Sequence, residues 1–318
     1  METRKLYYED PFQKGFATTV VSCDEVKGGY AVVLAETAFY PEGGGQPYDT
    51  GVLGEANVLE VHEKNGVITH LCDKPFEVGK SVSGKIDWAR RFDHMQQHSG
   101  EHICSGLICE RFHCDNVGFH MGADVVTIDF NADISWDELM EIEQLANLYI
   151  YEDHPIDIQF YRGAELDKVE YRSKKPLEGD VRIVSFPGAD CCACCGTHVM
   201  RSGQVGLVKF LSVQKFRDGV RIELLSGKRA HRYLSECWAQ DVRIAQALSV
   251  KPNASFAGVE RVLAELSTLK QRCAKLEESV FAQTAAQYEG KGDVLLFEDE
   301  MSGDSLRKLC DAVTNHCG

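Results

Sequence analysis

Two short metal-ligand patterns, nearly 100 positions apart, constrain the fold of this chain more than any other feature. In the first pattern, His94, His98 and His102 are spaced four apart in a segment with helical periodicity. Residues i and i+4 of a helix share one face, with Cβ atoms roughly 5–6 Å apart, as two ligands of one metal ion require. Most isolated pairs of this kind are ordinary surface or core histidines, so the pattern needs support from elsewhere in the chain.

The second pattern supplies that support. Cys194 and His198 offer a thiolate and an imidazole four positions apart, and Gly196 between them predicts a turn rather than a helix. Three nitrogens and one sulfur form a tetrahedral set that suits zinc and disfavours magnesium or calcium. The sequence therefore predicts one zinc ion per chain, held by two segments that the fold must bring together.

Spacing alone leaves two choices open within this site. The helical pair is either His98 with His102 or His94 with His98. The sulfur ligand is Cys194 or one of its neighbours, namely Cys191, Cys192 or Cys195. Thirteen cysteines are many for a reducing compartment, where they are more often free, catalytic or metal-bound than bridged.

The same segment permits a rival interpretation. The stretch from His98 to His102 matches the His-x-x-Glu-His motif of inverted zinc proteases, with Glu101 as general base. That class needs a downstream glutamate as third ligand, whereas this chain offers Cys194 and His198. The protease therefore ranks second, and in the preferred interpretation Glu101 is free to face solvent between the ligand turns.

Residues 1–89 are predicted to form a small β-barrel. Strand-type residues occupy 30–34 and 58–61, and Asn65-Gly66 before the apolar run 67–71 is a strong hairpin signal. The run Gly43-Gly44-Gly45-Gln46 predicts a loop.

Residues 90–227 are predicted to form an α+β core that contains the metal site. Asp93 is the expected N-cap of a helix running to about residue 111, and the capping box Ser135 to Glu138 opens a helix that runs to about Tyr151. Strands are predicted at 125–130, 156–161, 181–185, 205–213 and 220–225.

Residues 228–290 are predicted to be helical. Apolar residues at alternating spacings of three and four form a seam of about three heptads, made of Val259, Val262, Leu266, Leu269, Cys273, Leu276 and Val280. The seam packs either in an intramolecular hairpin or coiled coil against the helix around 230–248, or in a homodimer. Residues 291–318, with a strand at 294–298 and a helix at 304–315, are expected to be an incomplete fragment of a further α/β domain.

Composition limits the function classes. The net charge of −15 argues against a general nucleic-acid coat, because phosphate neutralisation needs clustered Lys and Arg. Local basic runs such as Arg90-Arg91 are most simply solvated faces. No run of about 18 apolar residues predicts a membrane span, and the first residues lack a secretory signal, so a cytoplasmic location is expected.

Three segments in this order resemble the editing domain of alanyl-tRNA synthetase, and still more its free-standing relatives, the AlaX trans-editing proteins. The likeness covers roughly residues 5–227. It rests on the glycine-rich stretch 37–51, the stretch 90–102 and the stretch Cys194-Cys-Gly-Thr-His198. The helical segment and the tail are similar to the long AlaX form, which adds a C-terminal domain of the DHH-associated type.

The resemblance implies the site. It selects His98, His102, Cys194 and His198 as zinc ligands and places the amino-acid pocket at Asn116 and His120, with the glycine-rich loop at Gly44 and Gly45. Apart from the resemblance, the nearby polar residues Gln46 and Thr37 are our candidates for positioning the catalytic water. Four protein ligands close a tetrahedral zinc, and closed sites are usually structural. Either one ligand is weak or displaced by the substrate, so that zinc can activate water, or zinc only orients the substrate, which is the preferred interpretation.

The resemblance also implies the function. The expected reaction is hydrolysis of mischarged Ser-tRNA(Ala), with Gly-tRNA(Ala) as a second candidate substrate. Because the editing barrel begins almost at Met1, no amino-acid-activating domain and no ATP use are expected. A non-catalytic, zinc-stabilised RNA-binding module is the alternative from another class. The family pattern has a glycine at position 195 and a hydroxyl residue near position 116, where this chain has Cys195 and Asn116.

Overall fold

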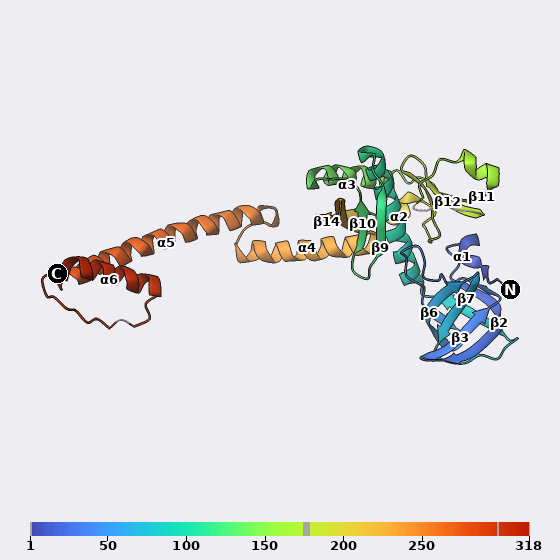
Figure 1. Cartoon of the computed structure of the whole chain (residues 1–318), viewed down its shortest axis with the longest axis horizontal. Helices are drawn as coiled ribbons and strands as arrows, with labels where there is room; N and C mark the ends of the chain where they lie inside the picture. Colours follow the sequence, from blue (N-terminus) through green and yellow to red (C-terminus); the bar gives the residue numbers. More distant parts are fainter. Residues whose placement is uncertain (1, 174–178, 298, 318) are drawn as a thin grey trace. The chain divides into compact units, whose positions relative to one another are not determined.

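The computed structural model describes residues 2–173, 179–297 and 299–317 (Figure 1). The fold is mixed α+β and divides into two compact units, Met1–Leu234 and Ser235–Gly318. Within the described residues, no helix is both long enough and apolar enough to cross a membrane.

Six N-terminal strands close into a barrel in the order β2-β3-β7-β6-β5-β8, coloured blue to cyan in Figure 1. They are β2 (Gly15–Val26), β3 (Gly29–Leu34), β5 (Gly51–Leu53), β6 (Ala56–Lys64), β7 (Val67–Cys72) and β8 (Ser81–Ile86). Beside them, β1 (Arg4–Lys5) pairs in parallel with β4 (Glu36–Thr37), and α1 (Leu6–Glu9) follows β1. Closure removes the exposed strand edges that an open sheet would leave.

The predicted hairpin at Asn65-Gly66 is present between β6 and β7. Both residues have positive φ angles, 52° and 78°, as a tight hairpin turn requires. Inward-facing side chains of the barrel, such as Val32, Leu53, Val61 and Ile68, are fully buried.

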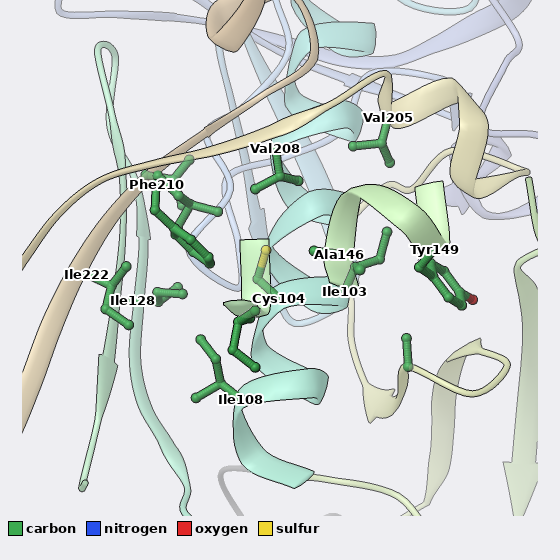
Figure 2. Close-up of a cluster of buried hydrophobic side chains, with 14 of the residues drawn as sticks. Ile103, Cys104, Ile108, Ile128, Ala146, Tyr149, Val205, Val208, Phe210 and Ile222 are labelled. Carbon is green, nitrogen blue, oxygen red and sulfur yellow. The ribbon is translucent and has the colours of Figure 1, made fainter. Parts of the chain in front are cut away.

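The second core lies between helices and an antiparallel sheet of order β14-β15-β10-β9. The strands are β9 (Asn116–Met121), β10 (Val126–Phe130), β14 (Val208–Phe216) and β15 (Gly219–Ser226), and the helices are α2 (Trp88–Phe112) and α3 (Trp136–Tyr151). Figure 2 shows apolar side chains of α2, α3 and the sheet meeting in this core. The predicted capping box of α3 is confirmed, since Ser135 and Glu138 bond reciprocally.

The start of α2 differs from the sequence prediction. The helix begins at Trp88, ahead of the predicted start after Asp93, because Asp87 is the N-cap and accepts a hydrogen bond from the Arg90 amide. Asp93, the predicted cap, lies inside the helix and instead forms an ion pair with Arg229. The earlier start places His98 and His102 in the middle of a long helix, away from its ends.

A third, three-stranded sheet carries the second ligand pattern. Its order is β11 (Asp157–Arg162), β12 (Asp180–Phe186) and β13 (Asp190–Ala193), and β13 leads directly into the segment 194–198. Two short 3-10 helices, Gly163–Lys168 and Ser202–Val205, follow β11 and precede β14. The second of these explains why the strand predicted to begin at 205 begins at Val208.

The C-terminal helices are α4 (Gly227–Ala247), α5 (Ser255–Ala286) and α6 (Gly303–Cys317), with the 3-10 turn Pro252–Ala254 before α5. The predicted seam on α5 is exposed, with 45%, 56% and 58% of the surface accessible at Leu266, Leu269 and Leu276. An intramolecular hairpin therefore does not bury it.

The tail also differs from the prediction. Residues 294–297 form no strand, and residue 298 lies outside the described residues. Leu309 and Val313 of α6 pack with Phe281 and Ala285 of α5, so this helix does bury its apolar face.

Candidate metal centre

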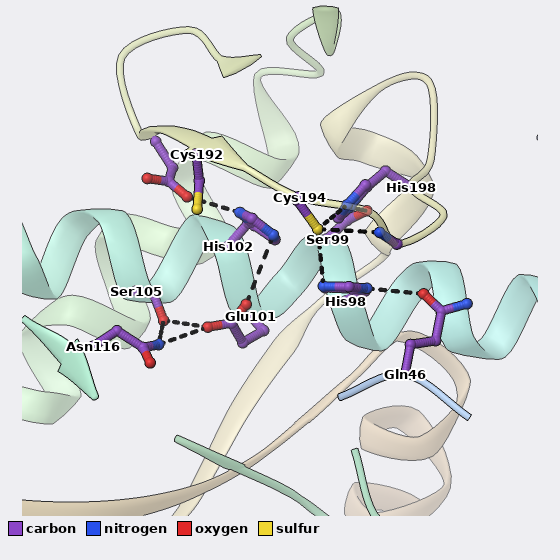
Figure 3. Close-up of polar contacts among 12 residues, drawn as sticks. Gln46, His98, Ser99, Glu101, His102, Ser105, Asn116, Cys192, Cys194 and His198 are labelled. Carbon is purple, nitrogen blue, oxygen red and sulfur yellow. Dashed lines mark hydrogen bonds and ion pairs between the residues drawn. The ribbon is translucent and has the colours of Figure 1, made fainter. Parts of the chain in front are cut away.

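Two ligand candidates come from α2 and two from the segment after β13. His98 and His102 lie one helical turn apart, with ring centroids separated by 5.2 Å. Cys194 and His198 approach the same helix face (Figure 3). One ligand atom from each residue lies within 4.8 Å of all the others, and the three histidines are at most 3% exposed. The two patterns therefore form one buried cluster that could hold a metal ion.

The sulfur of Cys194 lies at the centre of this cluster. Its Sγ is 3.4 Å from His98 Nε2 and 3.3 Å from His198 Nε2, and the Gly196 amide donates to it at 3.3 Å. A Cβ on Gly196 would lie 2.1 Å from the ring of His98. Only glycine at position 196 lets the turn come this close to the imidazole.

Gln46 orients His98 from behind. Its Oε1 is 2.8 Å from His98 Nδ1 and also accepts from the Thr197 amide, while its Nε2 donates to the Thr197 hydroxyl. An Nδ1–H bonded to Gln46 leaves the Nε2 lone pair facing the cluster. Gln46 is fully buried, and the glycine-rich loop thereby joins the barrel to both ligand segments.

His102 is oriented by a carboxylate. Its Nδ1 is 2.8 Å from Asp190 Oδ2, and Arg172 holds both oxygens of Asp190 at 2.7 and 2.8 Å. Burial raises the pKa of Asp190, but His102 and Arg172 outweigh it and keep that pKa below its usual value. A carboxylate behind a histidine is the usual support of a metal-binding imidazole.

Ser99 lies behind His198. Its Oγ is 3.3 Å from His198 Nδ1 and accepts from the Val199 amide at 3.1 Å. Each of the three histidines thus has a partner on the nitrogen that faces away from the cluster.

The electrostatics favour a thiolate at the centre. Burial raises the pKa of Cys194, but the adjacent His98, His198 and His102 outweigh burial and lower that pKa well below its ordinary value. For His102, burial acts in the direction of a lower pKa. The hydrogen bonds and charges of Asp190 and Cys194 outweigh burial, and the pKa of His102 is well above its ordinary value. A cation that binds this set takes the place of the proton on His102, because the ligands are then a thiolate and neutral imidazoles.

A cavity of about 300 Å³ opens beside the cluster. Its wall includes His98, His102, Cys194, Gly44 and Phe119, and the Phe119 ring stacks on His98 with centroids 5.0 Å apart. Gly45 allows this stacking, because a Cβ there would lie 2.6 Å from Phe119. The cavity gives a small ligand direct access to the cluster.

The same cavity is lined by Glu101 and Asn116, which form a buried polar group with Ser105. Glu101 Oε1 accepts from Ser105 Oγ at 2.6 Å and from Asn116 Nδ2 at 2.9 Å, and Glu101 Oε2 is 4.0 Å from His102 Nε2. Glu101 is 4% exposed, so the expectation that it faces solvent is wrong. Asn116 Oδ1 is buried and has no hydrogen-bond partner in the described part of the chain.

The structure decides between the alternatives that spacing left open. His98, His102, Cys194 and His198 come together, whereas His94 lies one turn earlier and outside the cluster. Cys192 groups instead with His102 and Asp190, and Cys195 is exposed.

Two residues expected in the site lie elsewhere. Thr37 is buried in the barrel, where its hydroxyl is 2.8 Å from His70 and accepts from the Phe39 amide, and no described contact joins it to the cluster. His120 is exposed on β9 and does not line the cavity, because strand alternation turns it away from the face that carries Phe119.

The residues that orient the ligands were not predicted from the sequence. Asp190 and Arg172 belong to no recognisable pattern, because their partners are distant in the sequence. The one available signal was Ser99, three positions before His102 in the helical segment.

Two family models match the chain. The model described as tRNA synthetases class II (A) matches residues 9–90, and the model described as threonyl and alanyl tRNA synthetase second additional domain matches residues 181–223. The first match covers the barrel, and the second covers β12, β13, the segment 194–198 and β14.

Curated relatives extend the likeness over most of the chain. The alanyl-tRNA editing protein AlaX-L of Pyrococcus horikoshii is 31% identical, covering 94% of this chain and 75% of the relative. The alanyl-tRNA editing protein Aarsd1-A of Xenopus laevis is 29% identical, covering 89% and 73%. The chain also matches the alanine–tRNA ligase of Pyrococcus abyssi at 36% identity, but spans only 36% of that ligase. This chain belongs to the alanyl-tRNA editing protein family.

Proposed function

We propose that this protein is a trans-editing hydrolase that deacylates Ser-tRNA(Ala), with Gly-tRNA(Ala) as a second substrate. The observation that carries the proposal is the buried cluster of three histidines and one cysteine in the wall of a 300 Å³ cavity. The names of the two editing relatives, both alanyl-tRNA editing proteins, support the substrate class.

We assign zinc as the metal. A tetrahedral zinc with bonds of about 2.0 Å to nitrogen and 2.3 Å to sulfur places the two kinds of atom roughly 3.5 Å apart. The distances of 3.3 and 3.4 Å from Cys194 Sγ to two imidazole nitrogens fit this value. When bound, zinc supplies a positive charge that attracts and orients the electron-rich atoms of the aminoacyl ester.

The polar residues of the cavity then select the amino acid. Glu101 carries a carboxylate whose Oε1 is held by Ser105 and Asn116, which leaves Oε2 to receive the ammonium group of the substrate. The unpartnered Oδ1 of Asn116 accepts a hydrogen bond from the seryl hydroxyl. Alanine has no such hydroxyl, and a buried polar group left unpaired disfavours its binding.

Gln46 has a positioning role in this proposal. Both ends of its amide already bond to His98 and Thr197, so it fixes a ligand ring instead of holding the attacking water. The ester carbonyl, water and ammonium group meet in the cavity, where fixed geometry supplies much of the rate acceleration.

The test is a deacylation assay with the purified full chain and Ser-, Gly- and Ala-tRNA(Ala), together with metal analysis of the same sample. The proposal requires release of serine much faster than of alanine, and about one zinc per chain. Zinc without hydrolysis of any substrate would instead support the RNA-binding module, which the closed set of four protein ligands favours. Cleavage of casein would support the protease.

The chain spans about a third of the length of the alanine–tRNA ligases it matches. We therefore propose, and do not infer from the ligases, that the protein acts on mischarged tRNA in the cytoplasm. We also propose that two copies of the chain form a homodimer through the exposed seam of α5. Light scattering of the purified chain measures the oligomeric state.

A further inference from the structure

A second cavity, of about 440 Å³, lies on α2 beside the metal centre and is not used by the proposed reaction. The first turns of α2 and α4 and the loops after Gln46 and after β9 form it. Its polar lining is Arg90, Asp93, His94, Lys228, Arg229 and Arg232. The volume falls within the roughly 300–1,000 Å³ of ligand pockets.

The charge of this cavity is opposite to that of the whole chain. Four of its lining residues are cationic and one is acidic, whereas the net charge of the chain is −15. Neighbouring cations repel one another, and a cavity lined mainly by one sign of charge attracts a ligand of the opposite sign. The cavity is therefore built for a negatively charged ligand.

Arg229 is bonded to other residues of the cavity wall, whereas Arg90 and Lys228 have donor atoms that a ligand can use. Arg229 is held by both oxygens of Asp93 and by the Gly122 carbonyl. Arg90 donates from its Nε to the Tyr48 carbonyl, and its guanidinium lies 5.7 Å from the centroid of the Tyr48 ring. Its Nη atoms have no hydrogen-bond partner among the residues that the structure describes. The same holds for Lys228 Nζ in that part of the chain.

His94 provides an independent observation. It lines the cavity at 3% exposure, and its Nδ1 has no hydrogen-bond partner among the described residues. Burial lowers the pKa of His94 to about 3, and the positive charges of Arg90 and Arg229 add to the effect. A buried polar atom without a partner is the kind of group that a bound ligand satisfies.

The cavity adjoins the metal centre along two chain segments. His94 precedes His98 by one helical turn, a rise of about 6 Å. Pro47 lines the cavity and directly follows Gln46, which holds His98. Consecutive residues along α2 and along the loop at Gln46 thus run from one cavity to the other, which is the arrangement that a ligand extending from the metal-centre cavity along these segments needs.

We infer that this cavity binds a backbone phosphodiester of the RNA strand whose aminoacylated 3′ end occupies the metal-centre cavity. Arg90 and Lys228 contact the phosphate oxygens, and Arg229 holds the shape of the cavity. The position of the strand relative to the metal centre rests on the proposed function, whereas the binding of an RNA phosphate does not.

Binding to a labelled RNA hairpin, with a base-paired stem and a single-stranded 3′ CCA end, tests the inference at several salt concentrations. We expect Arg90→Gln and Lys228→Gln each to weaken binding on the order of threefold to tenfold, to the same degree for hairpins of different stem sequence, and to reduce the salt slope by roughly 0.7–0.9. Lys215→Gln removes the same charge from an exposed position on β14 and serves as the control. Lys228 is exposed, so its substitution leaves the fold intact.

The kinetic arm compares Ser-tRNA(Ala) with 3′-O-seryl-adenosine, which has no phosphate. We expect the two variants to raise KM for the tRNA and to leave hydrolysis of the adenosine ester unchanged. If the wild-type chain hydrolyses neither ester but the variants still lose RNA binding, the proposed function fails and the phosphate site stands. Unaltered RNA binding and salt slope in both variants would overturn the phosphate site, as would inorganic phosphate binding that matches the affinity for the hairpin.

Discussion

Each histidine of the candidate metal centre is held through the ring nitrogen that faces away from the cluster. Gln46, Asp190 and Ser99 each engage the Nδ1 of one histidine. These contacts fix the ring orientation and the tautomer before any metal binds, which lowers the ordering cost of binding.

Cys194→Ala tests the sulfur ligand. It removes one of four donors and leaves three imidazoles, so we expect most of the bound zinc to be lost and deacylation of Ser-tRNA(Ala) to fall at least about 100-fold. Zinc content and single-turnover deacylation are measured on the same sample. Cys195→Ala, which alters an exposed neighbouring thiol, is the matched control and should retain both. Unchanged zinc and activity in the Cys194 variant would refute the site.

Asn116→Val tests selectivity. The substitution keeps the approximate size of the side chain but removes the Oδ1 acceptor and the bond to Glu101. We expect the ratio of kcat/KM for Ser-tRNA(Ala) over Ala-tRNA(Ala) to fall by roughly 10-fold to 100-fold, because one hydrogen bond to the seryl hydroxyl is lost. The zinc content should stay as in the wild type. An unchanged ratio would remove Asn116 from the amino-acid pocket.

Among the elements, the packing of α2 against its neighbours determines where the two ligand segments meet. Two glycines on α2 make this contact close. A Cβ on Gly100 would lie 2.1 Å from Ser226 Oγ of β15, and a Cβ on Gly106 would lie 2.0 Å from the Ala189 carbonyl beside β13. Because β13 carries the chain to Cys194, its distance from α2 sets the size of the metal site.

Gly106→Ala tests this dependence. The backbone of Ala189 cannot move away without displacing Asp190, which orients His102. We expect a loss of roughly 2–4 kcal/mol in the free energy of unfolding, measured with urea, and weaker zinc binding in titrations with a chelator. Gly15→Ala is the control, because a Cβ there makes only an ordinary contact at 3.6 Å. A Gly106 variant as stable as the control would contradict the close packing.

At the scale of the whole molecule, stability at mildly acidic pH depends on a buried histidine far from the metal centre. His70 lies in the barrel core between the Thr37 hydroxyl and the Val32 carbonyl, with no exposed surface. Burial lowers the pKa of His70 to about 4. Below the ordinary histidine pKa of about 6.5, the unfolded chain therefore binds a proton that the folded chain does not.

This linkage predicts a loss of stability on acidification. The His70 contribution is constant above pH 6.5 and should decrease as the pH falls from 6.5 to about 4, reaching roughly 3 kcal/mol. The free energy of unfolding in urea is measured as a function of pH for the wild type and for His70→Gln. The difference between the two profiles gives the His70 contribution, because the other titrating groups are common to both proteins. His62→Gln, on the exposed outer side of the barrel, is the control. Parallel pH profiles for the wild type and His70→Gln would contradict the prediction.

The sequence by itself determined the local features of this protein. The hairpin at Asn65-Gly66, the capping box at Ser135 and the helical face shared by His98 and His102 each depend on neighbours within a few positions, and such interactions can be recognised in a linear pattern. The paired ligand segments and the surrounding stretches were also enough to indicate the family.

Only the tertiary structure decided which residues complete the site. Among the neighbouring cysteines, Cys194 lies with the three histidines. Glu101 points into the protein and bonds to Asn116, and Thr37 lies in the barrel beside His70. Each position depends on contacts between different segments of the chain. The pair Arg90-Arg91 was expected on a solvated face, but Arg91 is fully buried and paired with Asp49, and Arg90 lines a cavity together with Lys228. Burial and charge proximity arise only when distant segments pack, so no local pattern could specify them.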